Sequence, residues 1–407
     1  MSLKRQCAIL IGGQGTRLGS LVHDTPKPML EVDGYPFVVH IIKQLTRFGF
    51  KDFILLTGYR GEVVEAYFGD GSVAKMLGVS IRCCREEFPL GTGGAILHAK
   101  ELLAREFLLC NGDSYFECNA QRLVFPFADN ASLGRIALRH IMHNTRYGSV
   151  RVADERVLAF NERDESNAAG LMNAGLYYLK REIIQCIPEN RPSSLERDIF
   201  PDLAEKKFLE YTEFPESYFI DIGIVEDLAR VRHEWVKKIT RPAIFFDRDG
   251  VLNRDTGYTH RPEDFCWLGD AQEAILYAND HGYNVFVVTN QAGIARGYYT
   301  EKDMRQLHQH MQQELSVIGA HIDDFAFCPH HPEGIVAGLN TVCLCRKPEN
   351  GMVERLLAEW PTNRTRSLLV GDKQSDVAAG EKSLLTTHLF TAEESLYSIV
   401  RTHIEKH

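Results

Sequence analysis

Residues 7–17 read CAILIGGQGTR, and residues 243–250 read AIFFDRDG. Each stretch is a short apolar run followed at once by a polar loop, which is typical of a buried strand that ends at a functional site. Between them lies the charged segment 236–242, VKKITRP, which ends in proline. We therefore expect two domains, residues 1–238 and residues 239–407, that begin with the same strand-and-loop arrangement.

Both halves continue with alternating strands and helices. In the first half, apolar residues recur at helical spacing from Phe37 to Phe48, and the pattern predicts strands at 52–57, 79–84 and 106–110 and helices at 61–68 and 94–104. In the second half it predicts strands near 243–247, 284–289, 324–328 and 367–371 and helices near 271–281, 301–318, 351–359 and 375–380. This alternation indicates the α/β class, with mostly parallel sheets that have helices on both faces.

The composition is that of a globular protein, because 44% of the 407 residues are hydrophobic and 25% are charged. There are 46 lysines and arginines against 55 acidic residues, and the net charge of −9 disfavours nucleic acids and anionic membranes as partners. No apolar run approaches the roughly 20 residues of a membrane helix, and the polar first residues do not resemble a signal peptide. We expect a cytoplasmic protein with small-molecule partners; the sequence leaves open whether it forms a homo-oligomer.

The loop after the first apolar run has features of a phosphate-binding site. Gly12, Gly13 and Gly15 let backbone N–H groups approach phosphate oxygens without interference from a Cβ atom, and Arg17 adds a cation. Lys27 stands between two prolines, which predicts an extended, pre-ordered segment that can place its charge beside a phosphoryl group. Taken alone, the glycines are also compatible with a simple tight turn.

The segments 12–18, GGQGTRL, and 25–29, TPKPM, together resemble the sugar-1-phosphate nucleotidyltransferase family. Further family motifs follow in order within residues 6–235: PLGTGGA at 89–95, NGD at 111–113, NAG at 173–175 and DIG at 221–223. The resemblance implies a Rossmann-like domain with a mixed sheet. It also implies a reaction in which a sugar 1-phosphate attacks the α-phosphorus of a nucleoside triphosphate and releases pyrophosphate.

The same resemblance implies roles for single residues. Lys27 and Arg17 are expected to be catalytic, and Asp113 and Asp221 to hold Mg²⁺. The residues expected to contact the sugar are Glu162 and Asn173. The residues expected to bind the nucleotide are Gly12, Gly13, Gly15, Thr16, Arg17, Lys27, Glu86, Gly91 and Asp113.

The identity of the base depends on the segment 85–91, REEFPLG, which lies where the family contacts the base. Guanine presents N1–H and N2–H₂ as neighbouring donors, and a carboxylate can accept from both. We therefore expect GTP as the nucleotide and Glu86 as the base-reading residue, with Glu87 as the next candidate. The alternative is that both are solvated loop charges. The LGTGG form of the motif is most similar to heptose-1-phosphate and mannose-1-phosphate guanylyltransferases.

The loop after the second apolar run carries two carboxylates, Asp247 and Asp249. One can attack phosphorus while the other, when protonated, gives a proton to the leaving oxygen. An isolated Asp-x-Asp pair is often only a helix cap or a solvated turn. Here the segment 287–291, VVTNQ, offers hydroxyl and amide donors, Lys347 offers a cation, and Asp372 follows another predicted strand with a carboxylate suited to Mg²⁺.

This order of residues resembles the haloacid dehalogenase-like phosphatases over about residues 243–390. The motifs DRDG at 247–250, GY at 257–258, TNQAGIARG at 289–297 and CRKP at 345–348 are most similar to heptose 1,7-bisphosphate 7-phosphatases, with histidinol-phosphate phosphatases as near relatives. The resemblance implies a doubly wound parallel sheet. It also implies that Asp247 is a nucleophile that forms an aspartyl-phosphate and that Asp249 is the general acid and then the base for water.

Further roles follow from this second resemblance. Lys347 is expected to take part in catalysis, and Mg²⁺ is expected to be held by Asp247, Asp372 and the backbone carbonyl of Asp249. The residues expected to bind the phosphorylated substrate are Asp255, Tyr258, Thr289, Asn290, Gln291, Ala292, Arg346, Lys347 and Lys373.

A cysteine-rich segment precedes the CRKP motif. Cys328 and His330 are followed, after twelve residues, by Cys343 and Cys345. Thiolates and one imidazole suit tetrahedral Zn²⁺ with no open position, so we expect a structural zinc-binding loop that positions Arg346 and Lys347. His331 is the alternative ligand, and ordinary buried thiols beside a surface histidine pair are the alternative interpretation.

Taken together, the two halves predict a bifunctional enzyme that makes GDP-heptose from heptose 1,7-bisphosphate and GTP. A second hypothesis joins a mannose-1-phosphate guanylyltransferase to a histidinol-phosphate phosphatase. A third hypothesis, a nucleotide-sensing or scaffold protein with inactive sites, is disfavoured because its catalytic carboxylates should be lost. All of them are present: Asp113, Asp221, Asp247, Asp249 and Asp372.

Overall fold

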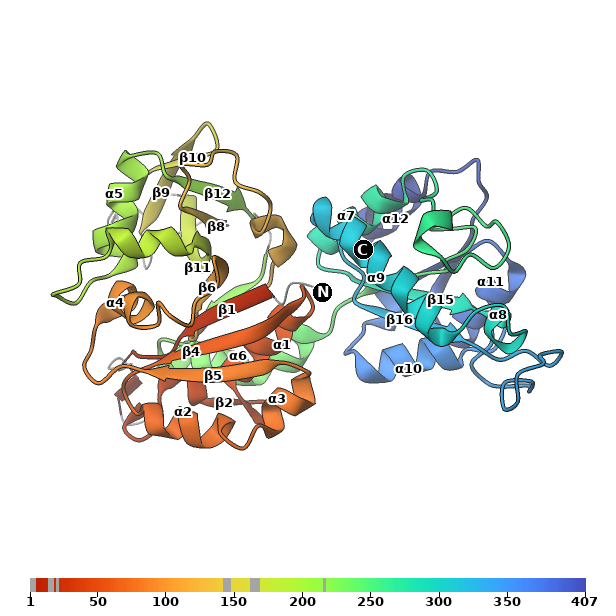
Figure 1. Ribbon diagram of the computed structural model, residues 1–407, viewed down its shortest axis with the longest axis horizontal. Helices are drawn as coiled ribbons and strands as arrows, with labels where there is room; N and C mark the ends of the chain where they lie inside the picture. Colours follow the sequence, from red (N-terminus) through yellow and green to blue (C-terminus); the bar gives the residue numbers. More distant parts are fainter. Residues whose placement is uncertain (1–4, 14–17, 20–21, 142–147, 162–168, 215–216) are drawn as a thin grey trace. The chain divides into compact units, whose positions relative to one another are not determined.

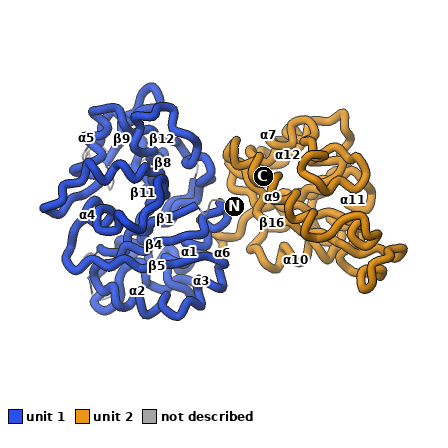
Figure 2. The backbone as a smooth tube through the Cα atoms, in the orientation of Figure 1, with its two compact units in different colours: residues 1–235 blue, residues 236–407 orange. Residues whose placement is uncertain are grey.

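The computed structural model describes residues 5–13, 18–19, 22–141, 148–161, 169–214 and 217–407. The chain forms two compact units, residues 1–235 and 236–407 (Figure 2). The change from one unit to the other falls within helix α6 (Val225–Ile239). The domain boundary that we propose from the sequence, after residue 238, lies in the same helix.

The first unit is built on a nine-stranded mixed sheet with the order β5-β4-β1-β6-β11-β8-β12-β10-β9 (Figure 1). The neighbours β1, β4, β5 and β6 are parallel, whereas β11 runs antiparallel to both β6 and β8. The strands of the parallel part are β1 (Arg5–Leu10), β4 (Phe50–Thr57), β5 (Ser80–Arg85) and β6 (Glu106–Asn111). Those of the second part are β8 (Gly134–Ile141), β9 (Ser149–Ala153), β10 (Arg156–Asn161), β11 (Gly170–Lys180) and β12 (Leu209–Glu213).

The helices of this unit are α1 (Phe37–Thr46), α2 (Gly61–Phe68), α3 (Ser72–Leu77), α4 (Gly91–His98), α5 (Phe200–Glu205) and most of α6. Two short strand pairs add β2 (Glu31–Val32) to β3 (Tyr35–Pro36) and β7 (Ser114–Phe116) to β13 (Phe219–Asp221). The sequence predicts the four strands of the parallel part, β1, β4, β5 and β6, to within two residues. It places α4 too late, at 94–104. The apolar pattern continues to Leu103, which is buried in the core, but the helix itself ends at His98.

The second unit has a five-stranded parallel sheet with the order β16-β15-β14-β17-β18. Its strands are β14 (Ala243–Phe246), β15 (Asn284–Asn290), β16 (Asp324–Cys328), β17 (Leu368–Gly371) and β18 (Thr386–Leu389). The helices are α7 (Ala271–Asp280), α8 (Ala292–Ala295), α9 (Glu301–Val317), α10 (Gly351–Glu359), α11 (Gln374–Lys382) and α12 (Leu396–Lys406). All four predicted strands are present, and β18, α8 and α12 are additional.

Alternate residues of the central strand β14 belong to two different cores, as the pleat of a strand requires. Ile244 and Phe246 pack in one cluster with buried residues of α7, α9 and α12, whereas Ala243 and Phe245 pack in the other with α10. Helices therefore cover both faces of the sheet, which is a doubly wound arrangement. Such sheets leave the carboxyl ends of their strands open, and Asp247 and Asp372 each follow directly after a strand.

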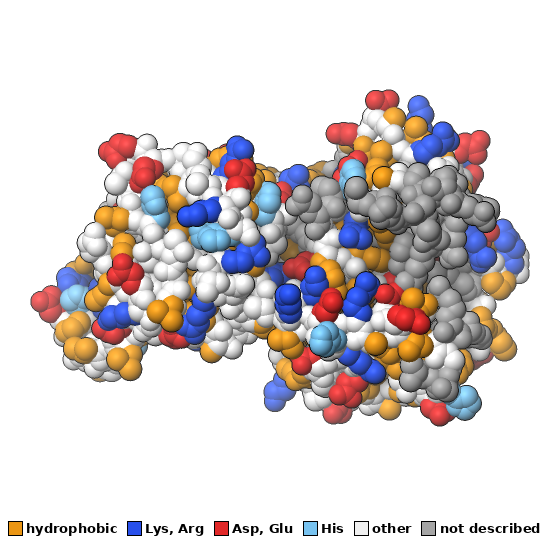
Figure 3. All heavy atoms as spheres, turned by 180° about the vertical axis from the view of Figure 1, so that it is seen from behind, with side chains coloured by type: hydrophobic (Ala, Val, Ile, Leu, Met, Phe, Trp, Pro, Cys, Tyr) orange, Lys and Arg blue, Asp and Glu red, His pale blue; other side chains and the backbone are white. Residues whose placement is uncertain are grey.

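The surface agrees with a protein of mixed charge. On the face drawn in Figure 3, basic and acidic side chains are interspersed, and the described atoms there form no continuous basic stripe of the kind that binds polyanions. Of the helices in the described part of the chain, none has the length and apolar character needed to cross a bilayer.

Candidate active sites

A cavity of about 990 Å³ opens in the first unit where β1, β4 and β6 end. The described residues that the sequence assigns to nucleotide binding all line it: Gly12, Gly13, Lys27, Glu86, Gly91 and Asp113. Three further candidates, Gly15, Thr16 and Arg17, lie outside the described residues. The volume is at the upper end of the range for small-molecule sites, which suits a nucleoside triphosphate.

Lys27 reaches this cavity from a buried position. Its segment is a 3₁₀ turn, Lys27–Met29, and not the extended segment that the flanking prolines predict. The fixed φ of Pro28 suits such a turn, which closes through the bond from the Met29 N–H to the Pro26 carbonyl. The turn presents the Lys27 ammonium 2.5 Å from Asp113 Oδ2.

The two carboxylates expected to hold a metal lie at neighbouring strand ends. Strand β13 pairs with β7 so that Asp221 lies opposite Ser114, and the Ile222 N–H donates to the Asp113 carbonyl. A Cβ atom at Gly223 would lie 2.7 Å from Asp221 Oδ1 and 3.4 Å from Lys27 Nζ, so the lysine and Asp221 converge on the same space. Two carboxylates beside a phosphate loop form a donor set that fits a hard divalent cation.

Glu86 lies beside the glycine loop, as a base-reading carboxylate should. Its Oε1 would be 3.1 Å from a Cβ at Gly12 and 2.6 Å from a Cβ at Gly58, so it approaches the backbone there closely. Its Oε2 accepts a hydrogen bond from the Leu90 N–H. The Glu86 side chain is half-buried, and this burial raises the pKa of its carboxyl group. Glu87 also lines the cavity but is exposed.

A second cavity of about 1150 Å³ adjoins the first, and both are lined by Asn111 and Glu196. It contains Asn173, one of the two residues expected to contact the sugar, and Asp221. The other expected sugar contact, Glu162, lies outside the described residues. The two adjoining cavities give room for two ligands that meet at Asn111 and Glu196.

A hydrogen-bonded chain of side chains connects these cavities. Asn173 donates to the Tyr177 hydroxyl at 2.9 Å, and that hydroxyl donates to Glu196 Oε1 at 3.3 Å. The other oxygen of Glu196 accepts from the hydroxyls of Thr92 and Ser194, both at 2.9 Å. Glu196 thus connects Thr92 of α4 with the second cavity, which contains Asn173. No motif in the sequence marks Glu196.

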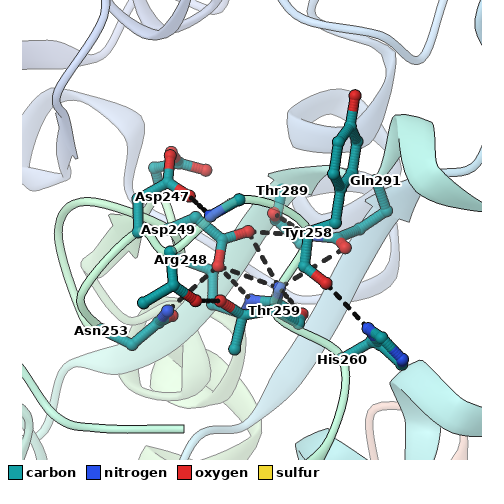
Figure 4. Close-up of polar contacts among 12 residues, drawn as sticks. Asp247, Arg248, Asp249, Asn253, Tyr258, Thr259, His260, Thr289 and Gln291 are labelled. Carbon is teal, nitrogen blue, oxygen red and sulfur yellow. Dashed lines mark hydrogen bonds and ion pairs between the residues drawn. The ribbon is translucent and has the colours of Figure 1, made fainter. Parts of the chain in front are cut away.

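The pocket of the second unit is smaller, about 210 Å³, and Figure 4 shows part of its surroundings. The sequence-predicted residues that line it are Asp247, Asp249, Asp255, Tyr258, Thr289, Asn290, Gln291, Ala292, Lys347 and Lys373. Four lining residues were not predicted: Gly257, Tyr299, Ser375 and Asp376. Arg346 is not among the described lining residues, and its guanidinium donates instead to the His330 carbonyl at 3.3 Å.

Asp247, Lys347 and Asp376 form a buried charged cluster. The Lys347 ammonium lies 2.6 Å from Asp247 Oδ1, 2.7 Å from Asp376 Oδ1 and 2.7 Å from the Val288 carbonyl. Burial would lower the pKa of Lys347, but the two carboxylates outweigh it and raise that pKa, so the ammonium stays charged. Burial raises the pKa of Asp247 to about 7, and Lys347 acts in the opposite direction.

The same cluster has the features of a cation site. Asp247, Asp372 and Asp376 can offer ligand atoms within 4.8 Å of one another. Asp372 Oδ1 is buried with no hydrogen-bond partner among the described residues, so it has an unused lone pair. Gly250 has a φ of +96°, and a Cβ atom there would lie 2.5 Å from Asp372 Oδ2. The carboxylates present therefore fit a hard divalent cation.

A second group of ligands lies in the loop between β16 and α10. The Sγ atoms of Cys328, Cys343 and Cys345 are 3.2–3.5 Å apart, and His330 Nδ1 is 3.3 Å and 3.7 Å from two of them. Metal–sulfur bonds of about 2.3 Å in a tetrahedron place sulfurs about 3.7 Å apart, so this group nearly has the spacing of a four-coordinate site. His331 instead contacts Arg296 and accepts from the Glu333 N–H, which favours His330 as the ligand.

Comparison with known proteins identifies both halves. Residues 7–238 match the family model described as nucleotidyl transferase, which is more than half of the chain. The chain therefore belongs to the nucleotidyl transferase family in its first unit. Residues 242–393 match the model described as polynucleotide kinase 3 phosphatase, so a phosphatase domain follows the nucleotidyl transferase domain.

Three relatives represent the two domains. The D-glycero-β-D-manno-heptose-1,7-bisphosphate 7-phosphatase of Rhodopseudomonas palustris is 44% identical over 154 residues, which are 38% of this chain and 86% of that protein. The D-glycero-α-D-manno-heptose 1-phosphate guanylyltransferase of Aneurinibacillus thermoaerophilus is 35% identical over 231 residues, 56% of this chain and 97% of that protein. The crystal structure of HddC from Yersinia pseudotuberculosis has a TM-score of 0.50 and 30% identity, and covers 57% of this chain and 99% of its own.

Among the site residues of the nucleotidyl transferase–phosphatase that sequence reasoning missed, two are acidic. Asp376 stands four residues after Asp372, at the start of α11, where its Oδ2 accepts from the Lys373 N–H at 2.9 Å. An acidic residue in the first turn of a helix is usually interpreted as a helix cap. The sequence therefore gives no indication that Asp376 contacts Lys347. Glu196 follows two serines in a segment without strand or helix periodicity, and no sequence signal marks it.

Proposed function

We propose that this chain is a bifunctional enzyme of GDP-heptose biosynthesis. The phosphatase domain removes the 7-phosphate of D-glycero-D-manno-heptose 1,7-bisphosphate, and the nucleotidyl transferase domain joins the resulting heptose 1-phosphate to GTP and releases pyrophosphate. The observation that carries the proposal is that one half matches a relative named as a heptose-1,7-bisphosphate 7-phosphatase, over 86% of that relative, and the other half matches one named as a heptose 1-phosphate guanylyltransferase, over 97%.

In the phosphatase domain, the buried cluster supports attack by Asp247 on phosphorus. Lys347 holds Asp247 Oδ1 at 2.6 Å, which leaves Oδ2 for the attack and stabilises the charge of the carboxylate. Mg²⁺ would be held by Asp247, Asp372 and Asp376, together with the Asp249 carbonyl, and supplies positive charge for the phosphoryl oxygens. Asp249 then gives its proton to the leaving sugar oxygen.

Substrate residues around this pocket hold the phosphoryl group in line with Asp247. The Asn290 side chain bonds twice to the Lys347 backbone, at 3.0 Å and 3.1 Å, so the end of β15 and the lysine are fixed together. Thr289 and Lys373 are proposed to bind phosphoryl oxygens, while Asp255 and Tyr258 contact the sugar at the opening. We keep Arg346 as a substrate contact that requires its guanidinium to leave the His330 carbonyl.

In the nucleotidyl transferase domain, the cavity at the ends of β1, β4 and β6 is proposed to bind GTP. Backbone N–H groups of Gly12 and Gly13 face the phosphates, and Lys27 neutralises charge that develops on the α-phosphoryl group. Mg²⁺ would be held by Asp113 and Asp221 and supplies charge for the triphosphate oxygens. The adjoining cavity, with Asn173 and Glu196, is proposed to bind heptose 1-phosphate.

Glu86 is proposed to select guanine over the other bases. Its carboxylate is partly buried against Gly12 and Gly58 at the edge of the cavity. Guanine is the base whose N1–H and N2–H₂ can donate together to one carboxylate. Partial burial strengthens such hydrogen bonds relative to those of a solvated glutamate such as Glu87.

The cysteine–histidine group is proposed to hold a structural Zn²⁺. Three thiolates and His330 Nδ1 form a complete tetrahedral set with no position left for water. Because Cys345 is two residues before Lys347, closure of the loop around the metal fixes the start of the CRKP segment. We also propose a cytoplasmic location and small-molecule partners only, GTP and heptose phosphates.

The test is to incubate the full chain with heptose 1,7-bisphosphate, GTP and Mg²⁺ and to detect the products by mass. GDP-heptose, phosphate and pyrophosphate are expected in equal amounts. Both anomers are needed, because the phosphatase relative is named for the β anomer and the guanylyltransferase relative for the α anomer. Turnover of mannose 1-phosphate and histidinol phosphate in preference to the heptose substrates would contradict the proposal.

A further inference from the structure

The Asp249 carboxylate accepts hydrogen bonds from three side chains, Arg248, Asn253 and Gln291 (Figure 4). The proposed mechanism has so far given none of them a part in proton transfer. Arg248 donates from Nε at 3.1 Å and from Nη2 at 2.9 Å to Oδ1, and Nη2 also lies 2.9 Å from Oδ2. Asn253 Nδ2 donates to Oδ1 at 3.0 Å, and Gln291 Nε2 donates to Oδ2 at 3.0 Å.

The two oxygens of Asp249 are held unequally. Oδ1 accepts from two groups of Arg248 and from Asn253, and both of these residues are fully buried. Oδ2 accepts from Arg248 Nη2, which also donates to Oδ1, and from Gln291, which lines the pocket. Oδ1 is therefore the anchored oxygen, and Oδ2 is the one whose partner lies next to the substrate.

A buried tyrosine fixes the orientation of Gln291. The Tyr299 hydroxyl donates to Gln291 Oε1 at 2.5 Å, and Arg248 Nη2 donates to the same oxygen over a longer distance, 3.4 Å. With Oε1 held in this way, Nε2 points to Asp249 Oδ2 and to Thr289 Oγ1 at 2.7 Å. Burial raises the pKa of Tyr299, so its hydroxyl keeps the proton that it donates. Its ring stacks on His260, with centroids 4.6 Å apart and planes 5° from parallel.

We infer that Arg248, Asn253 and Tyr299, the last acting through Gln291, are positioning residues for proton transfer by Asp249. Arg248 and Asn253 keep Oδ1 in place. Before the reaction, Oδ2 accepts from the Gln291 amide. During the reaction, the protonated Oδ2 releases that amide and donates to the leaving oxygen of the phosphoester. The orientation of Gln291 that Tyr299 imposes keeps Oδ2 on the pocket side until that exchange occurs.

The inference rests on the proposed phosphatase function and assigns the protons in both half-reactions. In the first, a bond forms from Asp247 Oδ2 to phosphorus, the bond from phosphorus to the sugar oxygen breaks, and the proton of Asp249 Oδ2 moves to that oxygen. In the second, water bonds to phosphorus and returns a proton to Asp249 as the Asp247–phosphorus bond breaks. The products are the sugar alcohol and inorganic phosphate.

The test compares leaving groups in the full chain, because a positioned acid matters only where the leaving oxygen needs a proton. The variant is Tyr299→Phe, which removes a single oxygen atom, and the readout is the first turnover, measured with enzyme in excess. With heptose 1,7-bisphosphate, we expect release of the sugar to slow about tenfold, the effect of one lost hydrogen bond in the transition state. With p-nitrophenyl phosphate, whose product is a stable anion, we expect a change of less than about twofold.

The matched control is Tyr298→Phe, which removes the hydroxyl of the neighbouring exposed tyrosine and should leave both first-turnover rates unchanged. Equal slowing of both substrates by Tyr299→Phe, or no slowing of the sugar substrate, would overturn the inference. If the unaltered chain releases phosphate from neither substrate, the phosphatase function itself fails, and that result is distinguishable from the other two.

Discussion

Each active site contains a buried lysine that contacts a carboxylate. Lys27 lies against Asp113 in the first unit, and Lys347 lies against Asp247 in the second. A buried ammonium is stable only with such a partner, and loss of either member leaves the other charge uncompensated. These single residues therefore both complete the local structure and place positive charge where we propose that a phosphoryl group binds.

Replacing Lys27 tests its proposed role in nucleotidyl transfer. Lys27→Ala should lower pyrophosphate release from GTP and heptose 1-phosphate by about 100-fold or more, because charge on the α-phosphoryl group loses its counter-ion. Phosphate release from heptose 1,7-bisphosphate should not change. Both are measured as steady-state rates of the full chain, with Lys43→Ala on exposed α1 surface as the control. Equal loss of both activities would contradict the role.

Replacing Glu86 tests the reading of the base. In Glu86→Gln the side chain keeps its shape, but one accepting oxygen becomes a donor that faces the donors of guanine. The ratio of kcat/KM for GTP to that for UTP should fall by about tenfold. The control is Glu87→Gln, since Glu87 lines the same cavity but is exposed. An unchanged ratio in Glu86→Gln would remove this residue from base selection.

At the residue scale, the sequence locates groups that stand in local motifs and misses those that reach the site from elsewhere. Eight of the ten predicted residues that line the phosphatase pocket belong to the motifs DRDG, GY, TNQAGIARG and CRKP. Asp376 was missed because its contact with Lys347 depends on how α11 packs, not on a local pattern. Glu196 was missed for the same reason, since it joins Tyr177 and Thr92 only in three dimensions.

At the scale of elements, the cysteine–histidine loop between β16 and α10 is a segment without helix or strand that contains the four proposed zinc ligands. A loop of this length loses much conformational entropy when it is ordered, and a bound metal offsets that loss. The loop leads directly into Lys347, whose ammonium is 2.6 Å from Asp247. The geometry of the cluster is thus expected to depend on the metal.

Removing this metal should therefore weaken substrate binding before it affects the attack by Asp247. We expect Cys343→Ser, or treatment with a zinc chelator, to raise KM for heptose 1,7-bisphosphate about tenfold with a smaller change in kcat. Bound zinc is measured in parallel by metal analysis of the purified chain. The control is Cys266→Ser, an exposed cysteine outside the group. If zinc is absent from the unaltered chain, the structural metal has to be reassigned.

The elements themselves are predictable where burial dominates. Strands such as β14 and β15 are continuous apolar runs because both faces of the sheet are covered, and such short unbroken runs are easy to recognise in the sequence. Strand β18 has the sequence TTHL and lies at the edge of the sheet, where one side needs no apolar residues. Helix α4 begins earlier than predicted because Gly91, with a φ of +76°, starts the segment against the Ser193 backbone.

At the scale of the whole molecule, the chain joins two units with separate cores and separate cavities. Each unit by itself covers 86% or 97% of a relative, so we expect each proposed set of catalytic groups to be complete within its own unit. Physical linkage raises the local concentration of an intermediate but creates no new chemistry. We therefore expect the two reactions to be independent of each other.

Mixing two inactivated chains tests this independence. Asp247→Asn should abolish phosphate release and Lys27→Ala should abolish most pyrophosphate release, so neither alone makes GDP-heptose from the bisphosphate. An equal mixture should restore production, because heptose 1-phosphate made by one chain diffuses to the other. The product is measured by mass against time. No recovery in the mixture would show that the intermediate passes between sites within one chain.

The contact between Gly250 and Asp372 has a consequence for how far this sequence can vary. A methyl group at position 250 would have to occupy space 2.5 Å from the Asp372 carboxylate, on a backbone with a φ of +96°. Alanine, the smallest change available, would therefore displace a proposed cation ligand while every ionisable side chain stayed in the chain. Tolerance to substitution at this position should be as low as at the aspartates themselves, although glycine has no chemistry of its own to lose.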